Sequence, residues 1–315
     1  MHFDFAQVTA PFRMQPGLRR IAPGQAQLTP SRPNGRHLRE KLAVLSTTAD
    51  EALLALPGFD AGPALRAIAR EAARGEMPPA FEFESGGDCS APRLGWALRG
   101  GRPVGDGEAA IGELLAALPA AKRAAALLCL AFEEDFAIID GTTATIPWLA
   151  VCLPSRWAPE EKLGRHFAEV HAPVADNTLL IEASDRLARL VTGSERWERF
   201  VWTLSADPRL HQHPKRGKVD WPEAKDAEAV AAVASLRHEH QTFIPVPGTG
   251  QAVFTIHVAS EPLDAALHTR GDATRLHDAL ASMSASVLAY RGLTSVRDPL
   301  LEALRRRSEA LPATA

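Results

Sequence analysis

Residues 154–177 read PSRWAPEEKLGRHFAEVHAPVADN, and this stretch carries the signals of one helix. Pro159 suits the first helical position, where no backbone N–H donor is needed, and the two glutamates after it place negative charge at the positive end of the helix dipole. Three apolar residues recur at helical spacing and share one face: Leu163, Phe167 and Val170. Because Pro173 disfavours helical backbone in the residue before it, the pattern predicts a helix from Pro159 to about His171.

The predicted helix places His171 beside its apolar face and in its last turn. An imidazole in that position can serve as an axial ligand of a haem iron. A histidine near a helix C-terminus can also interact favourably with the negative end of the helix dipole and have no further role. Helix geometry alone leaves both interpretations open.

The composition indicates an ordinary soluble globular protein. The chain has 315 residues, of which 46% are hydrophobic and 23% charged, enough for a sizeable core in one large domain or two modest ones. The formal net charge of −3 and the absence of a long basic run argue against a nucleic-acid partner. The sequence shows neither a signal-peptide core nor an apolar run of membrane-spanning length, so we expect no membrane partner and a cytoplasmic location.

Three cysteines, Cys89, Cys129 and Cys152, lack metal-ligand spacing, and their odd number argues against a disulfide framework. A Cys152 thiolate could ligate haem. A cysteine in an apolar strand is more typically a small core residue.

The first 134 residues are predicted to be mainly helical. Residues 1–40 are rich in Pro, Gly and Arg and are expected to form an irregular wrap, and residues 80–107 read as a glycine-rich loop region with one short strand near Trp96. The expected helices are 49–56, 64–73, 108–118 and 120–134.

From residue 135 the pattern mixes strands with helices. The expected strands are 136–140, 146–153, 197–204, 241–246 and 251–259, the last two joined by the turn Pro247–Gly250. The expected helices are 159–171, 178–192, a short alanine-rich helix after a polar loop at 205–226, then 272–291, and a last one from near Pro299.

This order of elements predicts an α+β protein with a PAS-like antiparallel sheet and a helical middle. Such domains hold ligands between the helical segment and one face of the sheet. We expect residues 1–315 to form a single unit, with 1–134 as a mainly helical elaboration, 135–260 as the PAS-like core and 261–315 as C-terminal helices.

Several histidines raise a second possibility, a non-haem metal site, because imidazole and carboxylate ligands suit Zn, Fe or Ni. The candidate ligands are His211, His213, His238, His240, Glu239 and His257. A cupin dioxygenase would require a Glu shortly after the second His-x-His pair, and none follows His240. Glu239 would face away from its two neighbours in an extended strand.

Four basic residues could pair with propionates or phosphates, although each alone is more typical of a solvated surface charge: Lys162, Arg165, Arg199 and Arg237. The sequence contains no Gly-x-Gly-x-x-Gly, P-loop or Gly-x-Ser-x-Gly motif, so dinucleotide, nucleotide-triphosphate and serine-hydrolase sites have no support.

The chain resembles the haem-dependent oxidative N-demethylases along its whole length. The resemblance rests on Pro11-Phe12, Pro16–Arg19, Pro154–Gly164, His171–Val174, Trp197–Trp202, Arg237–Thr242, Pro247 and Ala252–Ile256, in that order. It implies a PAS-like fold that binds haem b and uses dioxygen and an external reductant to oxidise, by N-dealkylation, a small amine. The candidate electron donors are NAD(P)H and a reductase partner that carries flavin or an iron–sulfur cluster. The resemblance is also compatible with a homo-oligomer.

Carried over residue by residue, the resemblance implies that His171 is the proximal haem ligand, with His211 as the next candidate. Arg199, Trp202 and Arg237 become contacts of the haem or another cofactor. Glu239 becomes a catalytic carboxylate near the substrate amine or its proton path, unless it forms a structural pair with Arg237.

Two positions depart from the family pattern, which has arginine where this chain has His240 and His257. Permanent cations are thereby replaced by groups that titrate near neutral pH. If the family arginines bind the reductant, we expect this protein to use a different electron donor. If they flank the substrate, we expect it to act on a different substrate. The competing function is a haem-based sensor or haem carrier without turnover.

Overall fold

A computed structural model describes residues 3–75, 77–84, 86–223 and 226–313. One residue of the predicted 80–107 loop and two of the predicted 205–226 loop lie outside these ranges. The described chain is an α+β protein, as predicted, with twelve α-helices, a seven-stranded antiparallel sheet and a four-stranded antiparallel sheet. Within the described ranges, none of the helices combines the length and the apolar character needed to cross a membrane.

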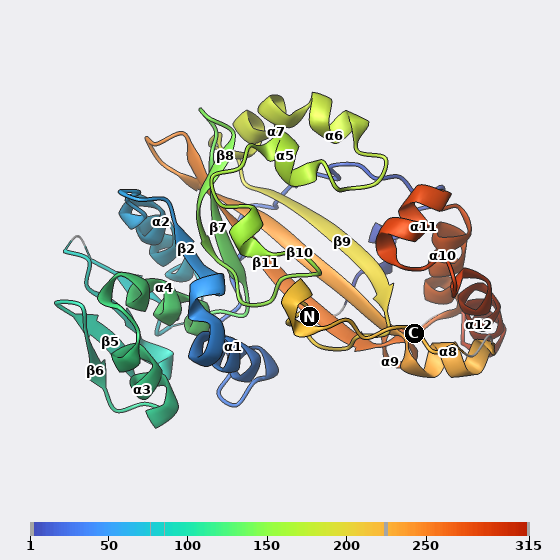
Figure 1. The fold of residues 1–315 in the computed structure, drawn as a ribbon, viewed down its shortest axis with the longest axis horizontal. Helices are drawn as coiled ribbons and strands as arrows, with labels where there is room; N and C mark the ends of the chain where they lie inside the picture. The colour runs from blue at the N-terminus through green and yellow to red at the C-terminus, as the bar shows by residue number, and fades with distance from the viewer. Residues whose placement is uncertain (1–2, 76, 85, 224–225, 314–315) are drawn as a thin grey trace.

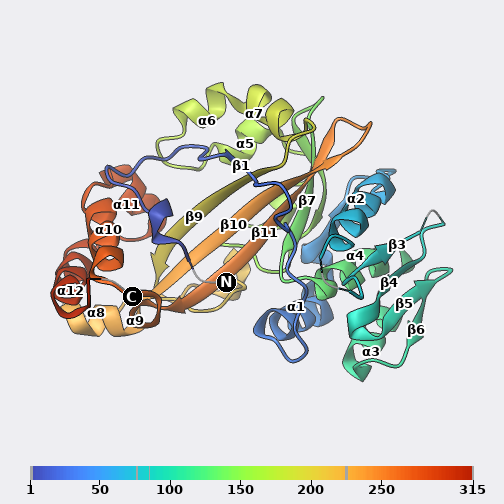
Figure 2. The same ribbon diagram turned by 180° about the vertical axis from the view of Figure 1, so that it is seen from behind.

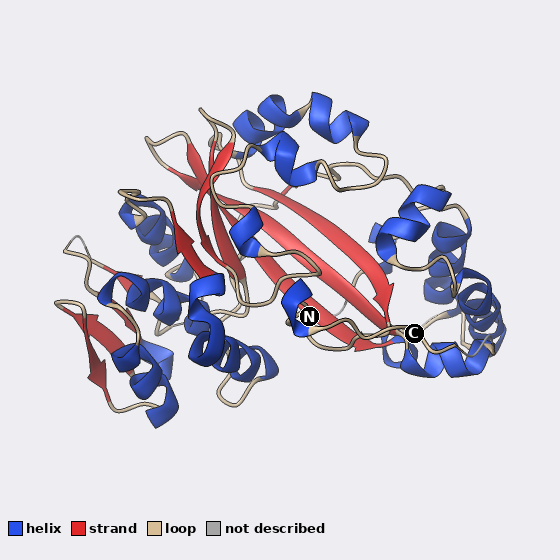
Figure 3. Cartoon of the chain, in the orientation of Figure 1, coloured by secondary structure: helices blue, strands red, loops and turns tan. Residues whose placement is uncertain are grey.

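The large sheet has the strand order β1-β9-β10-β11-β7-β8-β2 (Figures 1 and 3). The strand bounds are β1 Arg19–Arg20, β2 Leu53–Ala55, β7 Asp135–Asp140, β8 Thr145–Ala150, β9 Trp197–Ser205, β10 Ser235–Val246 and β11 Gln251–Pro262. All five predicted strands from residue 136 onward are present. The last two are longer than predicted, so that β10 also takes in the His238-Glu239-His240 segment.

Helices surround this sheet on three sides (Figure 1). Short helices α5 Phe167–His171, α6 Thr178–Glu182 and α7 Ser184–Val191 lie along one side of the long strands. One end carries α8 Ala227–Val233, α9 Leu263–Ala266, α10 Arg270–Ala281, α11 Ala285–Arg291 and α12 Arg297–Ala310. The other end carries α1 Arg36–Ala52, α2 Gly62–Ala72, α3 Ala109–Ala117, α4 Ala120–Ala131 and the small sheet, β3 Glu82–Phe83, β4 Cys89–Ala91, β5 Trp96–Arg99 and β6 Arg102–Gly105.

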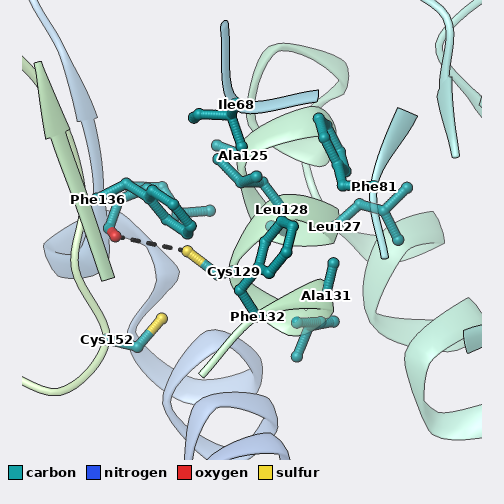
Figure 4. Close-up of a cluster of buried hydrophobic side chains, with 14 of the residues drawn as sticks. Ile68, Phe81, Ala125, Leu127, Leu128, Cys129, Ala131, Phe132, Phe136 and Cys152 are labelled. Carbon is teal, nitrogen blue, oxygen red and sulfur yellow. Dashed lines mark hydrogen bonds between the residues drawn. The ribbon is translucent and has the colours of Figure 1, made fainter. Parts of the chain in front are cut away.

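The largest buried cluster centres on α4, which packs against strands of both sheets (Figure 4). Leu127 and Leu128 are fully buried, and each such side chain contributes about 1.5–3 kcal/mol relative to exposure. The Cys129 thiol donates to the carbonyl of Ala150 (3.6 Å), and Cys152 lies nearby. All three cysteines are free and buried.

The predicted helix from Pro159 to His171 is wrong in its length, because Gly164 breaks it. A single 3₁₀ turn spans Pro159–Glu161, and Gly164 then adopts positive φ (+70°). Its N–H donates to the carbonyl of Ile146 (2.8 Å), so the chain attaches to β8 instead of continuing the helix. His166 starts α5 through a capping box with Glu169, and α5 ends at His171.

Other differences have equally local causes. The predicted helix 49–56 is the end of the longer α1 followed by β2, and the 80–107 loop region holds all four strands of the small sheet. The predicted helices 178–192 and 272–291 are each divided in two, at Ala183 and at 282–284, where Ser284 caps α11 by accepting from the Val287 N–H (3.2 Å).

The N-terminal segment crosses one face of the large sheet (Figure 2). Arg19 pairs with Glu198 of β9 (2.8 Å), and the Gln27 amide donates to the carbonyl of Phe243 in β10 (3.0 Å). The described part of the predicted irregular wrap is therefore an ordered cover, held by the two-residue strand β1 and by side-chain hydrogen bonds and ion pairs.

A buried ion pair joins this cover to the sheet. Lys41 of α1 is fully buried and lies 3.2 Å from the Asp135 carboxylate, and it donates to the carbonyls of Phe132 and Glu134. Burial is the largest single effect and lowers the pKa of Lys41, but the charge and hydrogen bond of Asp135, together with Cys129 and Cys152, leave the pKa raised. The ammonium is therefore charged inside the core.

We expect Lys41→Met to lower the free energy of unfolding by about 3–5 kcal/mol, because it leaves the Asp135 carboxylate buried without its cation. The matched control is Lys122→Met, which removes an ion pair with Asp50, a side chain that is 92% exposed, and should cost less than about 1 kcal/mol. Urea unfolding measures both values. Equal losses in the two variants would contradict a stabilising role for the buried pair.

His238 is buried on the covered face of β10, against the ring of Phe3 (centroids 4.8 Å apart). Neither of its ring nitrogens has a hydrogen-bond partner in the described part of the chain, and Glu261 is 3.8 Å away. Burial lowers the pKa of His238 to about 3, which shows that desolvation outweighs the distant carboxylate.

At a pH below 6.5, the ordinary pKa of histidine, His238 takes up a proton in the unfolded chain but not in the folded one. Acidification from about pH 6 to 4 should therefore lower the free energy of unfolding by about 1.4 kcal/mol per pH unit through this residue. We expect His238→Phe to lack that contribution. Urea unfolding at several pH values compares the variant with the parent and with the control His277→Phe, which changes a histidine that is 33% exposed. Parallel stability curves for the parent and His238→Phe would disprove the effect.

Candidate functional site

A cavity of about 470 Å³ lies between the uncovered face of the large sheet and the segment that follows β8. This volume is in the range of sites for cofactors and small ligands. The sheet wall is formed by Ala137, Ile139, Leu149, Arg199, Val201, Thr203, Arg237, Glu239, Gln241, Phe243, Phe254 and Ile256. The opposite wall includes Ser155, Arg156, Trp157, Lys162, Phe167, Val170, His171 and Leu180, and the rim includes Met14, Tyr290 and Arg291.

His171 is the one histidine among the residues described as lining this cavity. Its Nδ1 lies 2.8 Å from the Phe167 carbonyl, which can only accept, so Nδ1 carries the proton and Nε2 keeps a free lone pair. Asn177 fixes the end of α5 by donating to the carbonyls of His171 (3.1 Å) and Ala172 (2.8 Å). Burial lowers the pKa of His171, and the charges of Arg199 and Lys162 lower it further, which keeps the imidazole neutral.

The cavity lining carries more positive than negative charge. Its cations are Arg156, Lys162, Arg199, Arg237 and Arg291, against the carboxylates Glu161 and Glu239, an excess of three positive charges. The rest of the lining is largely apolar, with side chains such as Ile139 and Phe254. Such a lining favours a ligand that is apolar in its body and anionic at its edge.

Arg199 is the least satisfied of these cations. It makes no ion pair within 4 Å and no hydrogen bond to any described residue, and its Nε is fully buried. Burial lowers the pKa of Arg199, an effect that the nearby charge of Glu239 opposes. The enclosed Nε has no hydrogen-bond partner and the side chain lines the cavity, so this position is suited to an anionic group supplied by a ligand.

Glu239 is held by neutral donors. Its Oε1 accepts a hydrogen bond from the Ser155 hydroxyl, and its Oε2 accepts one from the Gln241 amide (2.5 Å). Arg237 donates to the Ser155 oxygen through Nε (2.9 Å) and Nη2 (2.8 Å), so the hydroxyl bridges the two charged groups. Among described residues, no cation lies within ion-pair distance of Glu239, and the structural pair with Arg237 is therefore indirect.

Arg237 is buried and fixed. Besides Ser155, it donates to the carbonyls of Arg209 and Leu210 (both 2.9 Å), and burial lowers its pKa to about 10. Most of its donors are therefore used by the protein itself. Arg199 rather than Arg237 has free donors for a ligand.

Trp202 is among the lining residues, but its side chain belongs to the C-terminal helical cluster. It meets Phe12 edge to face (centroids 5.8 Å apart), and the Arg291 guanidinium lies 5.3 Å from its ring. Arg291 also donates to the Trp202 carbonyl (2.5 Å). Trp202 thus packs behind this wall and holds Arg291 at the rim.

The remaining candidate ligands lie outside the cavity. His211 is bonded through Nδ1 to the Cys152 carbonyl (2.6 Å), and His213 through Nε2 to Glu160 (3.1 Å). Cys152 is fully buried in the core, where burial raises its pKa. Arg165, an exposed residue, has its guanidinium 3.6 Å from Glu169.

His238, His240 and His257 lie on the covered face of the sheet, opposite Glu239, as expected from the two-residue period of a strand. His240 bonds through Nε2 to Glu198 (2.7 Å). His240 and His257 are directly paired neighbours across β10 and β11. The positions where the family pattern has arginine therefore do not face the cavity.

Residues 110–301 match the model of the family described as haem-dependent oxidative N-demethylase, alpha subunit-like. The match covers more than half of the chain. The chain belongs to this family. The matched range contains every residue of the sheet wall of the cavity and the whole segment from Ser155 to Leu180. The family description implies haem dependence and, through the term alpha subunit, further protein subunits.

Several lining residues were not predicted from the sequence. Ser155 belongs to the quoted stretch, but its role as a bridge depends on β10, more than 80 residues later. Met14 and Arg291 reach the rim from the two ends of the chain. No local pattern identifies such residues, because their position results from long-range packing.

Proposed function

We propose that the protein is a haem b-dependent oxidoreductase that uses dioxygen and an external reductant to N-demethylate a small amine. The observation that carries the proposal is His171, whose Nδ1 is bonded to a backbone carbonyl so that the Nε2 lone pair is available at the cavity. Metal-ligating histidines typically donate the N–H of their other ring nitrogen to a backbone carbonyl or a carboxylate in this way.

The cavity residues fit a haem. His171 would ligate the iron, and the apolar lining suits the macrocycle. The unpaired Arg199 would pair with one propionate, and three other lining cations, Arg156, Lys162 and Arg291, supply further positive charge for the second. The sheet order around the cavity, β8-β7-β11-β10-β9, supports the expected PAS-like arrangement.

When bound, haem would supply dioxygen activation: with two electrons and two protons from outside, one oxygen atom leaves as water and the other in formaldehyde derived from the N-methyl group. Two protein groups would act on the amine. Glu239, fixed by Ser155 and Gln241, can balance the charge of an ammonium substrate or accept its proton. Because no described cation pairs with it directly, this carboxylate is available to a cationic ligand.

The first experiment is an absorption spectrum of freshly purified protein, in which we expect a Soret band. Oxygen uptake and formaldehyde release are then followed with dithionite-free reductants, including NAD(P)H with a flavin or iron–sulfur reductase, and with small secondary and tertiary methylamines. Matched consumption of dioxygen and release of formaldehyde supports the enzyme. Reversible CO binding without turnover under all these conditions would favour a haem sensor or carrier.

His171→Ala should lose haem or shift the Soret band while the fold survives, because the variant removes the one cavity imidazole among the described residues. The matched control is His211→Ala, which removes a partly buried histidine outside the cavity and should leave haem content unchanged. Pyridine-haemochrome assays and circular dichroism measure both variants. Unaltered haem content and spectrum in His171→Ala would remove His171 as the ligand.

Glu239→Gln should keep its haem, but its rate of product formation should fall by about a hundredfold or more, the usual scale for a proton-transfer group. The shape of the side chain is preserved, and only its charge is lost. Glu161→Gln removes the other carboxylate of the lining, which has no bond to Ser155, and should retain most of the activity. Near-normal turnover of haem-replete Glu239→Gln would exclude Glu239 from the mechanism.

A further inference from the structure

A second group of metal-ligating side chains lies on the covered face of the sheet. His37 comes from the first turn of α1, Glu133 lies two residues after the end of α4, and His257 lies in the middle of β11. One ligand atom from each residue lies within 4.8 Å of the other two. The three side chains are only 14%, 13% and 4% exposed, respectively.

The hydrogen bonds of His37 leave an unfavourable contact in the absence of a cation. Its Nε2 lies 2.7 Å from the Val258 carbonyl, which can only accept, so Nε2 carries the proton of a neutral ring. The lone pair of Nδ1 then faces a Glu133 carboxylate oxygen at 3.5 Å. Two acceptors that face each other repel unless a proton or a metal ion lies between them.

A divalent ion needs a neutral ring with a free lone pair. The Val258 carbonyl binds Nε2 of His37 and so leaves that lone pair on Nδ1, which faces Glu133.

The distances suit one shared ion. Zn²⁺ binds imidazole nitrogen and carboxylate oxygen at about 2.0–2.1 Å, so neighbouring ligand atoms of a tetrahedral site lie about 3.3 Å apart. The same Glu133 oxygen lies 3.0 Å from His257 Nε2 and 3.5 Å from His37 Nδ1.

We propose that His37, Glu133 and His257 bind a divalent transition-metal ion of the Zn²⁺ or Fe²⁺ class, with water in the remaining coordination positions. Two imidazoles and one carboxylate form a ligand set that these ions prefer over Mg²⁺ or Ca²⁺. The site is distinct from the cavity, because His257 and the cavity-lining Ile256 point to opposite faces of β11. It does not depend on the proposed function.

The ligands are held in position before any ion binds. Lys41, one turn after His37 on α1, donates to the carbonyls of the residues on both sides of Glu133, and its charge is balanced by Asp135. The Glu133 N–H donates to the Thr29 carbonyl (2.9 Å). The Val258 carbonyl orients the His37 ring, which is the usual outer-shell partner of a ligating histidine.

An ion at this site would connect three segments that are far apart in the sequence. It would fasten α1 and the chain after α4 to β11, the strand that also forms part of the cavity wall. We therefore assign it a stabilising role and expect the bound ion to raise the melting temperature by a few degrees at a hundredfold excess over its Kd.

Zn²⁺ and Co²⁺ are the probes, added to chelator-treated full-length protein whose haem content is known. Equilibrium dialysis with elemental analysis should give one Zn²⁺ per chain, counted separately from haem iron, and Co²⁺ should give visible d–d bands. His257→Gln and Glu133→Gln should each bind at least about a hundredfold more weakly. The matched control His240→Gln removes the neighbouring buried histidine and should bind Zn²⁺ as the parent does.

The proposal is overturned if the parent takes up no stoichiometric Zn²⁺ or Co²⁺. It is equally overturned if His257→Gln retains binding, which would place the ion on an exposed pair such as His277 and Asp278. If the variants fail to fold, X-ray absorption of the Zn²⁺-loaded parent decides: two imidazoles with oxygen ligands support the site, and any other ligand set excludes it.

Discussion

The two-residue period of β10 is the constraint on which the rest of the molecule depends. This strand is paired without a break to β9 over Ser235–Phe243 and to β11 over its whole length, so its register cannot slip locally. A shift of one residue would exchange the faces of Glu239 and its two neighbouring histidines. The register of β10 therefore determines both which side chains line the cavity and which side chains lie on the covered face.

The cavity face carries positive charge that the protein does not fully balance. Arg199 has no ion-pair or hydrogen-bond partner among the described residues, and the lining cations outnumber the lining carboxylates by three. On the other face, Glu198 has two partners, Arg19 and His240, although the ring nitrogens of His238 have none among the described residues. A net positive lining that contains an unpartnered guanidinium is typical of a ligand site, where an anionic partner completes it.

The sequence allowed the strands and the composition of the site to be predicted, because alternation and apolar runs are local signals. Arg199, Glu239 and His171 were expected at one site, and all three line the cavity. Breaks within helices were missed where one residue decides them, as at Gly164, whose N–H bonds to β8. Pairs between distant segments were also missed, since nothing in the sequence near His37 indicates that α1 lies against β11. Haem binding itself was inferred from resemblance and not from periodicity.

His240 and His257 stand where the resemblance to the family leads us to expect arginine, and the face of the sheet on which they lie limits what this difference can do. Because His240 and His257 point away from the cavity, their exchange for arginine does not alter the charge around a bound substrate directly. Any influence of these two residues on a bound substrate would be indirect, through the strands. In β11, Ile256 lines the cavity, the next residue, His257, bonds to Glu133, and the Val258 carbonyl binds His37. A long, permanently charged arginine at 257 would place a cation where the two imidazoles and Glu133 now meet, and would exclude a metal ion. In this chain the shorter, neutral imidazole allows a ligand cluster to form directly behind the cavity wall.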